Sequence, residues 1–311
     1  MDAAAVRDAL GLDGTFADWL DGLDTGAPDP PRAPLPDAAT AARLLERVAV
    51  PAEDIPIVLA ARPSTDAEQW IVDREHHLLV TTLGETGYLW WPPLHDAPAR
   101  STQLMHVWAF LAALPGVREW HAARGIPDGV SWATLADLGQ NLYENQLINH
   151  DTGLDVPWWM TLHFRGGIYQ LGRLQFERRT SRGDSALGVH IPETGPMTPD
   201  ACDASIAWAH EFFPAHFPEE TPVLATCASW LLDPQLADYL PTDSNIVRFQ
   251  QRFTLRPDKT VADNSSICRF VFHDPDPDLD ALPQDTTLQR AIVSHIKAGG
   301  TWQMGNGWFE W

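Results

Sequence analysis

The sequence predicts an α+β (α/β) protein, in which a mostly helical N-terminal part precedes a mixed β-sheet flanked by helices. Apolar residues recur at helical spacing through most of residues 1–150, which is typical of packed helices. From Leu187 onward the order is strand, loop, helix and strand, which is typical of a sheet covered by helices. A chain of 311 residues is long enough for two domains, and we expect them at residues 1–150 and 151–311.

The N-terminal part is predicted to be a bundle of helices. Ile55–Ala61 is an apolar run that fits either a strand or a buried helix. Ala27–Pro36 carries five prolines and is expected to be a linker or an extended arm, while Gly84–Pro93 is a predicted turn. Six segments have the apolar spacing of a helix: Asp2–Leu10, Phe16–Leu23, Ala38–Val48, Asp66–Thr82, Thr102–Leu114 and Trp132–Ile148.

The pattern changes after Asp151. Val156–Gly172 has helical spacing and is predicted to cross the sheet as a helix. Leu174–Arg179 and Leu187–Ile191 are predicted strands, and the connection between them contains a glycine, as hairpin connections often do. Three charged residues of this region are expected to form cross-strand ion pairs: Arg173, Glu177 and Arg178.

A helix is predicted to begin at Thr198. Thr198 can cap it, Pro199 suits its first turn, and Asp200 complements its positive end. Pro214 is expected to end it. The elements predicted after it are a strand at Val223–Leu232, a short helix from Asp233 to Leu240, strands at Asn245–Leu255 and Cys268–Phe272, and a helix at Thr287–Lys297. The aromatic tail, Gly299–Trp311, is expected to fold back on a domain interface or a pocket rim.

Composition excludes several classes of protein. An apolar fraction of 44% supports a packed core, and a net charge of −21 argues against binding to nucleic acid. Cys202, Cys227 and Cys268 are too few and too scattered for a disulfide framework or a zinc site, so we expect reduced thiols and a cytoplasmic protein without a bound metal. We expect no signal peptide, because residues 1–8 lack a basic region followed by an apolar core, and no apolar run approaches the length that spans a membrane.

The order of elements after Leu187 predicts a ligand-binding site. A strand that leads into a helix whose first turn faces the sheet can hold an anion. The helix then returns the chain to a strand that we expect to be parallel to the first. If two such strands diverge, they leave a slot for an extended ligand.

Four phrases of the sequence resemble a bacterial acyltransferase family. They are LGRLQFER at 171–178, LGVHIPETG at 187–195, SWLLDP at 229–234 and SNIVRF at 244–249. In that family a helical N-acyltransferase N-terminal domain precedes a GNAT-like C-terminal domain. The resemblance extends from about residue 35 to residue 311, and it implies an N-acyltransferase that uses acetyl-CoA or another acyl-CoA.

The resemblance also implies where the acyl-CoA lies. Its pantetheine arm would pair with the strand that contains Gly188, Val189 and Ile191. Its pyrophosphate would lie at the following loop and helix start, at residues that include Thr194, Gly195 and Thr198, with Asn245 as a further candidate. The loop departs from the family's glycine-rich pattern, because Glu193 and Asp200 are anionic and Pro196 and Pro199 lack N–H donors. Binding of the donor would then depend on Arg182 or another basic group, or the donor would be the arm of a carrier protein.

Candidate catalytic residues follow from the chemistry of amide formation, which needs a base for the amine and sometimes an acid for the thiolate. His190 and Glu193 are candidate bases, and the alternatives are a histidine bonded within the sheet and a solvated carboxylate. Tyr239 is a candidate acid by the resemblance, or a surface residue of a short helix. Cys227 is a candidate nucleophile with His190 as its base, or inert filler. Ser229 could bond the thioester or the amide product.

These observations support one main hypothesis and two alternatives. The first is an N-acyltransferase that moves an acyl group from a CoA-type thioester to an amine of a small molecule or peptide, with an acyl carrier protein as a further possible partner. The second is a non-catalytic binding protein on a GNAT scaffold. The third is a Cys227-dependent acyl-thioester transferase or hydrolase.

Overall fold

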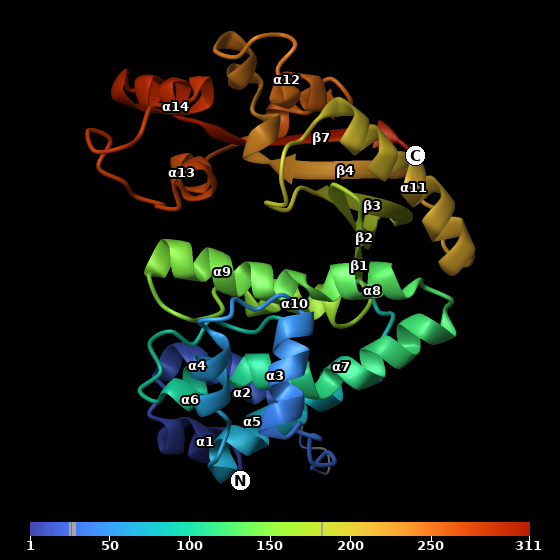
Figure 1. The fold of residues 1–311 in the computed structure, drawn as a ribbon, viewed down its shortest axis with the longest axis vertical. Coiled ribbons are helices and arrows are strands. Elements are labelled where there is room, and N and C mark those ends of the chain that lie inside the picture. Colours follow the sequence, from blue (N-terminus) through green and yellow to red (C-terminus); the bar gives the residue numbers. More distant parts are fainter. Residues whose placement is uncertain (25, 27–28, 182) are drawn as a thin grey trace. The chain divides into compact units, whose positions relative to one another are not determined.

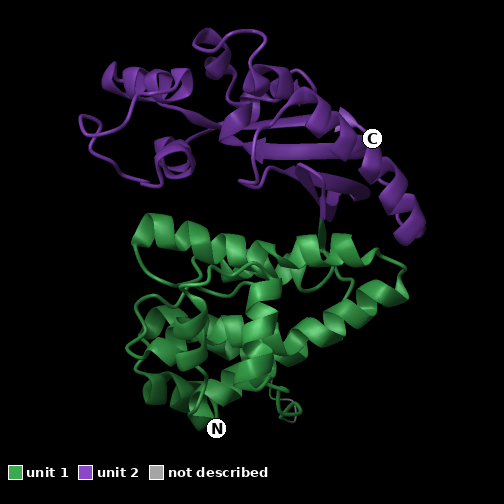
Figure 2. Cartoon of the chain, viewed as in Figure 1, with its two compact units in different colours: residues 1–169 green, residues 170–311 purple. Residues whose placement is uncertain are grey.

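The structure, a computed structural model, describes residues 1–24, 26, 29–181 and 183–311, which form two compact units. The first unit is Met1–Tyr169 and the second is Gln170–Trp311 (Figure 2). Arg182 lies outside the described residues, as do parts of the predicted proline-rich arm and of the predicted hairpin connection. No helix of the described residues is both long and apolar enough to cross a membrane.

The first unit is a bundle of helices, as the apolar spacing predicts. Its helices are α1 (Ala3–Leu10), α2 (Ala17–Leu23), α3 (Ala38–Arg47), α4 (Ile55–Ala60), α5 (Asp66–Thr81), α6 (Arg100–Gln103), α7 (Met105–Ala123), α8 (Asp128–Leu135), α9 (Asp137–Asn149) and α10 (Pro157–His163). The ambiguous run at 55–61 is therefore helical. The predicted helix 132–148 is two helices that meet at Ala136.

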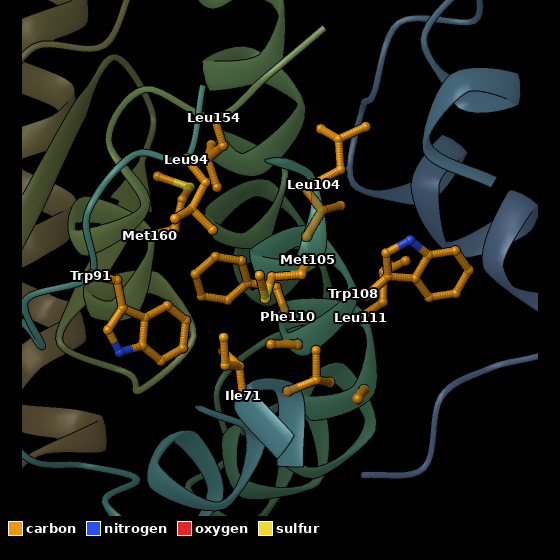
Figure 3. Close-up of a cluster of buried hydrophobic side chains, with 14 of the residues drawn as sticks. Ile71, Trp91, Leu94, Leu104, Met105, Trp108, Phe110, Leu111, Leu154 and Met160 are labelled. Carbon is orange, nitrogen blue, oxygen red and sulfur yellow. The ribbon is translucent and has the colours of Figure 1, made fainter. Parts of the chain in front are cut away.

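Helix α7 is the centre of this unit. Every residue from Met105 to Leu114 is at most 3% exposed, which is the burial expected of a helix surrounded by other elements. Its side chains pack with Ile71 of α5 and with Trp91 and Met160 (Figure 3). The unit therefore has one continuous hydrophobic core.

The second unit is built on a mixed sheet with the strand order β1-β2-β3-β4-β7-β5, and β6 pairs with β7. The strands are β1 (Ile168–Leu171), β2 (Leu174–Ser181), β3 (Asp184–His190), β4 (Leu224–Ser229), β5 (Thr254–Leu255), β6 (Val261–Ala262) and β7 (Gln303–Glu310). The helices are α11 (Pro199–His216), α12 (Asn245–Gln250), α13 (Asn264–Phe272) and α14 (Thr287–Lys297), and short 3-10 turns lie at 230–232, 234–238 and 257–259.

The β3–α11–β4 segment has the predicted order. Strands β3 and β4 are parallel, and Thr198 caps α11 by accepting a hydrogen bond from the Ala201 N–H. Pro214 does not end the helix, which runs on to His216. Helix α11 covers one face of the sheet, because Phe213 packs against Phe176 of β2. Phe176, Leu187, Val189 and Ala225 share this face and are at most 1% exposed.

Three predictions about residues 156–272 are wrong. Asn245–Leu255 is not a strand: Ser244 caps α12, and only Thr254–Leu255 pairs with β7. Cys268–Phe272 belongs to α13, whose cap is Asp263. Val156–Gly172 is not one long helix but the short α10 followed by β1. In each case a capping side chain or a glycine turn decides the local structure against the apolar pattern.

The aromatic tail folds back, but as a strand of the sheet. Strand β7 lies side by side with β4, antiparallel to it, with Thr226 facing Trp308 and Ser229 facing Gly305 (Figure 1). On its other edge it pairs with β5 and β6. The segment predicted to cover a rim is therefore an interior strand.

Candidate active site

Strands β3 and β4 diverge partway along their length. They face each other at three positions, and within the described part of the chain the last facing pair is Gly188 and Thr226. Strand β3 nevertheless continues to His190, which faces Gln175 of β2, and β4 continues to Ser229, which faces Gly305 of β7. Because each strand stays with its outer neighbour, the two must part beyond Gly188.

His190 lies on the diverging end of β3 and is paired with a carboxylate. Its Nε2 is 2.9 Å from Oε2 of Glu177 on β2. The exposed fractions of the two side chains are 28% for His190 and 12% for Glu177. Arg179 adds positive charge, with Nη1 3.7 Å from the same carboxylate oxygen. The sequence prediction of a histidine on the face opposite Val189 is confirmed by the β2–β3 register.

Gly188 makes room for this pair. A Cβ atom at this position would lie 2.7 Å from Oε2 of Glu177 and 3.0 Å from Nε2 of His190. These are closer approaches than side chains tolerate without moving. A side chain at residue 188, which is also expected to border the acyl-CoA, would therefore require Glu177 or His190 to shift.

Arginines from two other elements hold the loop that follows β3. Arg173, in the turn before β2, donates to the carbonyl oxygen of Pro192 through Nη1 (2.8 Å) and to that of Gly195 through Nε (3.0 Å). Arg252, which follows α12, donates to Asp203 at 2.7 Å and to the Pro199 carbonyl oxygen at 3.0 Å. The anionic loop is thus flanked by two cations that the loop sequence alone does not contain.

The loop residues predicted to contact acyl-CoA are at the surface. Thr194, Gly195 and Thr198 are exposed, as is Asn245 at the first position of α12. Gly195 has φ +109°, a backbone conformation that favours glycine. Glu193 is also exposed, and its Oε1 lies 3.9 Å from Nε2 of His273.

Comparison with known proteins shows which family has this sequence and fold. Residues 39–166 match the N-acyltransferase N-terminal domain, and residues 168–309 match the GNAT-like C-terminal domain. A solved acyltransferase in complex with decanoyl-CoA and teicoplanin is 40% identical, with a TM-score of 0.93 over 100% of this chain and 99% of that one. The chain belongs to this acyltransferase family.

Two other solved structures agree with this membership. An acyltransferase in complex with CoA and 10C-teicoplanin is 40% identical, and a tryptophan-to-alanine mutant in complex with octanoyl-CoA is 39% identical; each has a TM-score of 0.93 over 100% of this chain and 99% of its own. A search of the curated proteins found no match. The chain is thus an enzyme, an acyltransferase, and the alternative of a non-catalytic binding protein is not supported.

The acyltransferase does not combine Cys227 with His190. Gly188 faces Thr226 across the parallel strands, so the side chain of His190 lies on the Thr226 face and that of Cys227 on the opposite one. Cys227 is 4% exposed, and burial raises the pKa of its thiol to about 12. The prediction of a Cys227–His190 pair is wrong because the alternation along the strands separates the two side chains.

Ser229 and Tyr239 have partners of their own in the acyltransferase. The Ser229 hydroxyl accepts a hydrogen bond from the Leu231 N–H and so caps the 3-10 turn after β4. The Tyr239 hydroxyl lies 2.9 Å from Nδ1 of His295, and its ring packs against Trp302. Their roles in thioester binding and as the acid stay predictions.

Sequence reasoning predicted a cross-strand ion pair for Glu177, and the structure has one with His190, but it gave Glu177 no part in the site; Arg173 bonds the carbonyl oxygens of Pro192 and Gly195 in place of a cross-strand partner. Glu177 pairs with His190, and Arg178 pairs with Glu220, with 3.1 Å between Arg178 Nε and the carboxylate oxygens. The register of the β2–β3 hairpin brings Glu177 and His190 to one face, and the alternation in the sequence carries that signal only once the register is known. No group of three or more His, Cys, Asp or Glu side chains among the described residues is placed to hold a metal ion.

Proposed function

We propose that this acyltransferase moves a fatty acyl group from acyl-CoA to an amine of a peptide-like or small-molecule acceptor, with His190 as the general base. The observation that carries the proposal is the divergence of β3 and β4 after Gly188 and Thr226, with His190 on the diverging strand. The relatives in complex with decanoyl-CoA, octanoyl-CoA and teicoplanin support both the donor and the class of acceptor.

The donor fits the chain's main-chain groups and cations. An extended thioester arm can pair with a strand edge that lacks a neighbour, and on the β4 side this edge begins after Gly188, with Val189 in β3 and Ile191 directly after it. The loop from Thr194 to Thr198 leads into the start of α11, where a helix favours negative charge. Arg173 and Arg252 flank this place, and Asn245 at the start of α12 is a further contact that we propose for the nucleotide end.

His190 would act on the acceptor. The amine nitrogen gives a proton to the imidazole as its lone pair forms a bond to the thioester carbonyl carbon. The tetrahedral intermediate then collapses, the C–S bond breaks, and the CoA thiolate leaves and takes up a proton. A base positioned in this way contributes about 10²- to 10⁴-fold to such a reaction. Glu193 stays a proposed contact for the acceptor amine, because it is an exposed carboxylate beside the end of β3.

The test uses the full chain with decanoyl-CoA as the donor and a form of teicoplanin with a free amine as the acceptor. His190→Ala is expected to lower kcat by about 10²- to 10⁴-fold and to leave the calorimetric Kd for decanoyl-CoA within twofold. His77→Ala, at an exposed histidine of α5, is the matched control and should retain activity. Wild-type kcat in His190→Ala would overturn the base, and failure of the wild-type protein to bind decanoyl-CoA at millimolar concentration would overturn the donor.

The acyl carrier protein is tested in the same assay. Decanoyl thioester on a purified carrier protein replaces decanoyl-CoA at equal concentration, and product is measured by mass spectrometry. We expect CoA to be the better donor, because Arg173 and Arg252 lie beside the loop at the start of α11. A higher kcat/KM with the carrier-protein thioester would reverse this assignment.

A further inference from the structure

We propose that Glu177 is a positioning residue, which holds His190 in the tautomer with the proton on Nε2 and the lone pair on Nδ1. This inference rests on the proposed role of His190 as the base. It concerns a carboxylate that lies on a different strand and acts only through the ring.

The sheet brings the two side chains together by register. In the β2–β3 hairpin Glu177 faces Gly188, and His190 faces Gln175. Glu177 and His190 are therefore diagonal neighbours on one face, at a separation that long side chains can bridge. The 2.9 Å distance between Oε2 and Nε2 is that of a hydrogen bond to an ionised acceptor.

Burial and neighbouring charge favour an ordered carboxylate. The Glu177 side chain is 12% exposed, less than half of the value for His190. Among the described residues Arg179 is a charged group that faces it, 3.7 Å away and 44% exposed. Gly188 lies beneath both partners, and the clash that a Cβ there would make with each of them shows how closely they occupy this space. The carboxylate thus has little freedom to leave the ring.

The chemistry follows from this contact. A neutral imidazole carries one N–H, and an ionised carboxylate can only accept a hydrogen bond, so the ring nitrogen that faces the carboxylate is the one that carries the proton. With Nε2–H donated to Glu177, the lone pair that takes the proton of the amine is on Nδ1. When Nδ1 is protonated the ring becomes a cation, and the adjacent carboxylate stabilises it without itself being protonated. Glu177 thus orients the base and compensates the charge that develops on it.

The first measurement needs no variant. Nitrogen-15 NMR of histidine-labelled protein, with His190 assigned from the spectrum of His190→Ala, distinguishes the two neutral tautomers by the shifts of the two ring nitrogens. We expect a protonated Nε2 and an unprotonated Nδ1. A protonated Nδ1 in the wild-type protein would overturn the proposal whatever any variant does.

Glu177→Gln then tests the contribution to rate. The amide keeps the shape but can donate as well as accept, so both tautomers become possible. We expect kcat to fall by about 10- to 10³-fold, KM for decanoyl-CoA to stay within twofold, and the nitrogen signature to become mixed. Glu177→Asp should retain the signature, with an intermediate kcat. Glu219→Gln, an exposed carboxylate near the end of α11, is the control and should match the wild type.

The design separates this inference from the proposed function. If His190→Ala retains activity, the base itself is wrong. If His190→Ala is inactive while Glu177→Gln keeps both the wild-type kcat and the wild-type tautomer, only the positioning role falls. A purely structural role of Glu177 would lower the melting temperature of Glu177→Gln and leave its tautomer and kcat unchanged at assay temperature. The double variant should be no slower than His190→Ala, because the carboxylate acts only through the ring.

Discussion

Gly188 and Thr226 face each other across β3 and β4, and they form the last such pair in the described part of the chain before the strands part. The Thr226 hydroxyl donates a hydrogen bond to the Leu187 carbonyl oxygen at 3.3 Å, just short of that point. Gly188 also lies under the Glu177–His190 contact. Gly188 is therefore both the last residue of β3 that faces β4 and the residue that lies against the Glu177–His190 pair.

Gly188→Ala should impair the base more than the fold. The new methyl would come within 2.7 Å of Glu177 Oε2, so the carboxylate or the ring must move, at an overpacking cost of about 1–3 kcal/mol in the free energy of unfolding. We expect kcat to fall at least 10-fold. Gly129→Ala in α8, where a Cβ meets nothing within 4 Å, is the control. An unchanged kcat in Gly188→Ala would show that the pair does not need this space.

Arg173→Met should weaken binding of the donor. The side chain keeps its apolar stem but loses the two hydrogen bonds to the carbonyl oxygens of Pro192 and Gly195. We expect the Kd for decanoyl-CoA to rise about 10-fold, equivalent to about 1.4 kcal/mol, with kcat at saturation little changed. Arg256→Met removes an arginine whose side chain pairs with exposed Asp258, and it should leave Kd unchanged. Equal effects of the two variants would contradict a specific role of Arg173 in the loop.

The thiol of Cys227 should be inert. Burial raises its pKa to about 12, so almost none of it is thiolate at pH 8, and the thiolate is the reactive form. Cys202 and Cys268 are also buried. We expect no cysteine to react with Ellman's reagent in the native protein, and all three to react after denaturation. Cys227→Ala should keep its activity, whereas an acyl-thioester trapped on Cys227 and seen by mass spectrometry would restore the nucleophile hypothesis.

Tyr239→Phe measures whether this tyrosine supplies the acid. The hydroxyl is 2.9 Å from His295 Nδ1 and the ring packs on Trp302, so removal of the oxygen should cost about 1 kcal/mol of stability. If Tyr239 protonates the thiolate, kcat should also fall at least 10-fold, and a donor with a better leaving group should restore it. His295→Leu is the matched control, because it removes the same hydrogen bond and keeps the phenol.

The stability of the first unit should fall in acid because of His121. Burial lowers the pKa of this histidine to about 3, from an ordinary value of 6.5, and its Nδ1 is 2.6 Å from the Ser131 hydroxyl. Between these two values the unfolded chain binds one more proton than the folded one. The contribution is therefore fully present above pH 6.5 and is lost as the pH falls, at about 1.4 kcal/mol per pH unit.

His121→Gln should reduce the slope of unfolding free energy against pH between pH 6 and 4 by about one proton. Urea titrations at several pH values measure this slope directly. His77→Gln, at an exposed histidine of α5, should leave it unchanged. An equal slope in the wild type and His121→Gln would mean that the ring is already protonated in the folded protein.

Local signals predicted much of the fold correctly. Thr198 and Pro199 predict the start of α11 from the sequence alone, because a cap bonds residues that are close to it in the chain. The same physics explains an error: Val247 and Phe249 alternate as in a strand, but Ser244 caps a helix. Strand β7 contains Gly305 and Gly307 and lacks an alternating apolar pattern, so only its pairing with β4 makes it a strand.

The candidate site was predictable only in part. Alternation along β3 is enough to place His190 on the face opposite Val189. Glu177 and Arg173 were expected in cross-strand ion pairs, but their partners could not be assigned, because these depend on the hairpin register and on the path of the loop after β3. Cys227 and His190 are on adjacent strands, yet the register places them on opposite faces. Which side chains share a face and pair with one another depends on contacts between strands, and the propensities of single segments do not contain it.

The place of β7 between β4 and β5 has a consequence for biosynthesis. Strand β4 leaves the ribosome long before residues 303–310, so its partner edge stays uncovered while α12, α13 and α14 are translated. Uncovered strand edges recruit other chains. The nascent enzyme is therefore most open to pairing with other chains during this interval, whereas the helical unit made before it can already have buried its core.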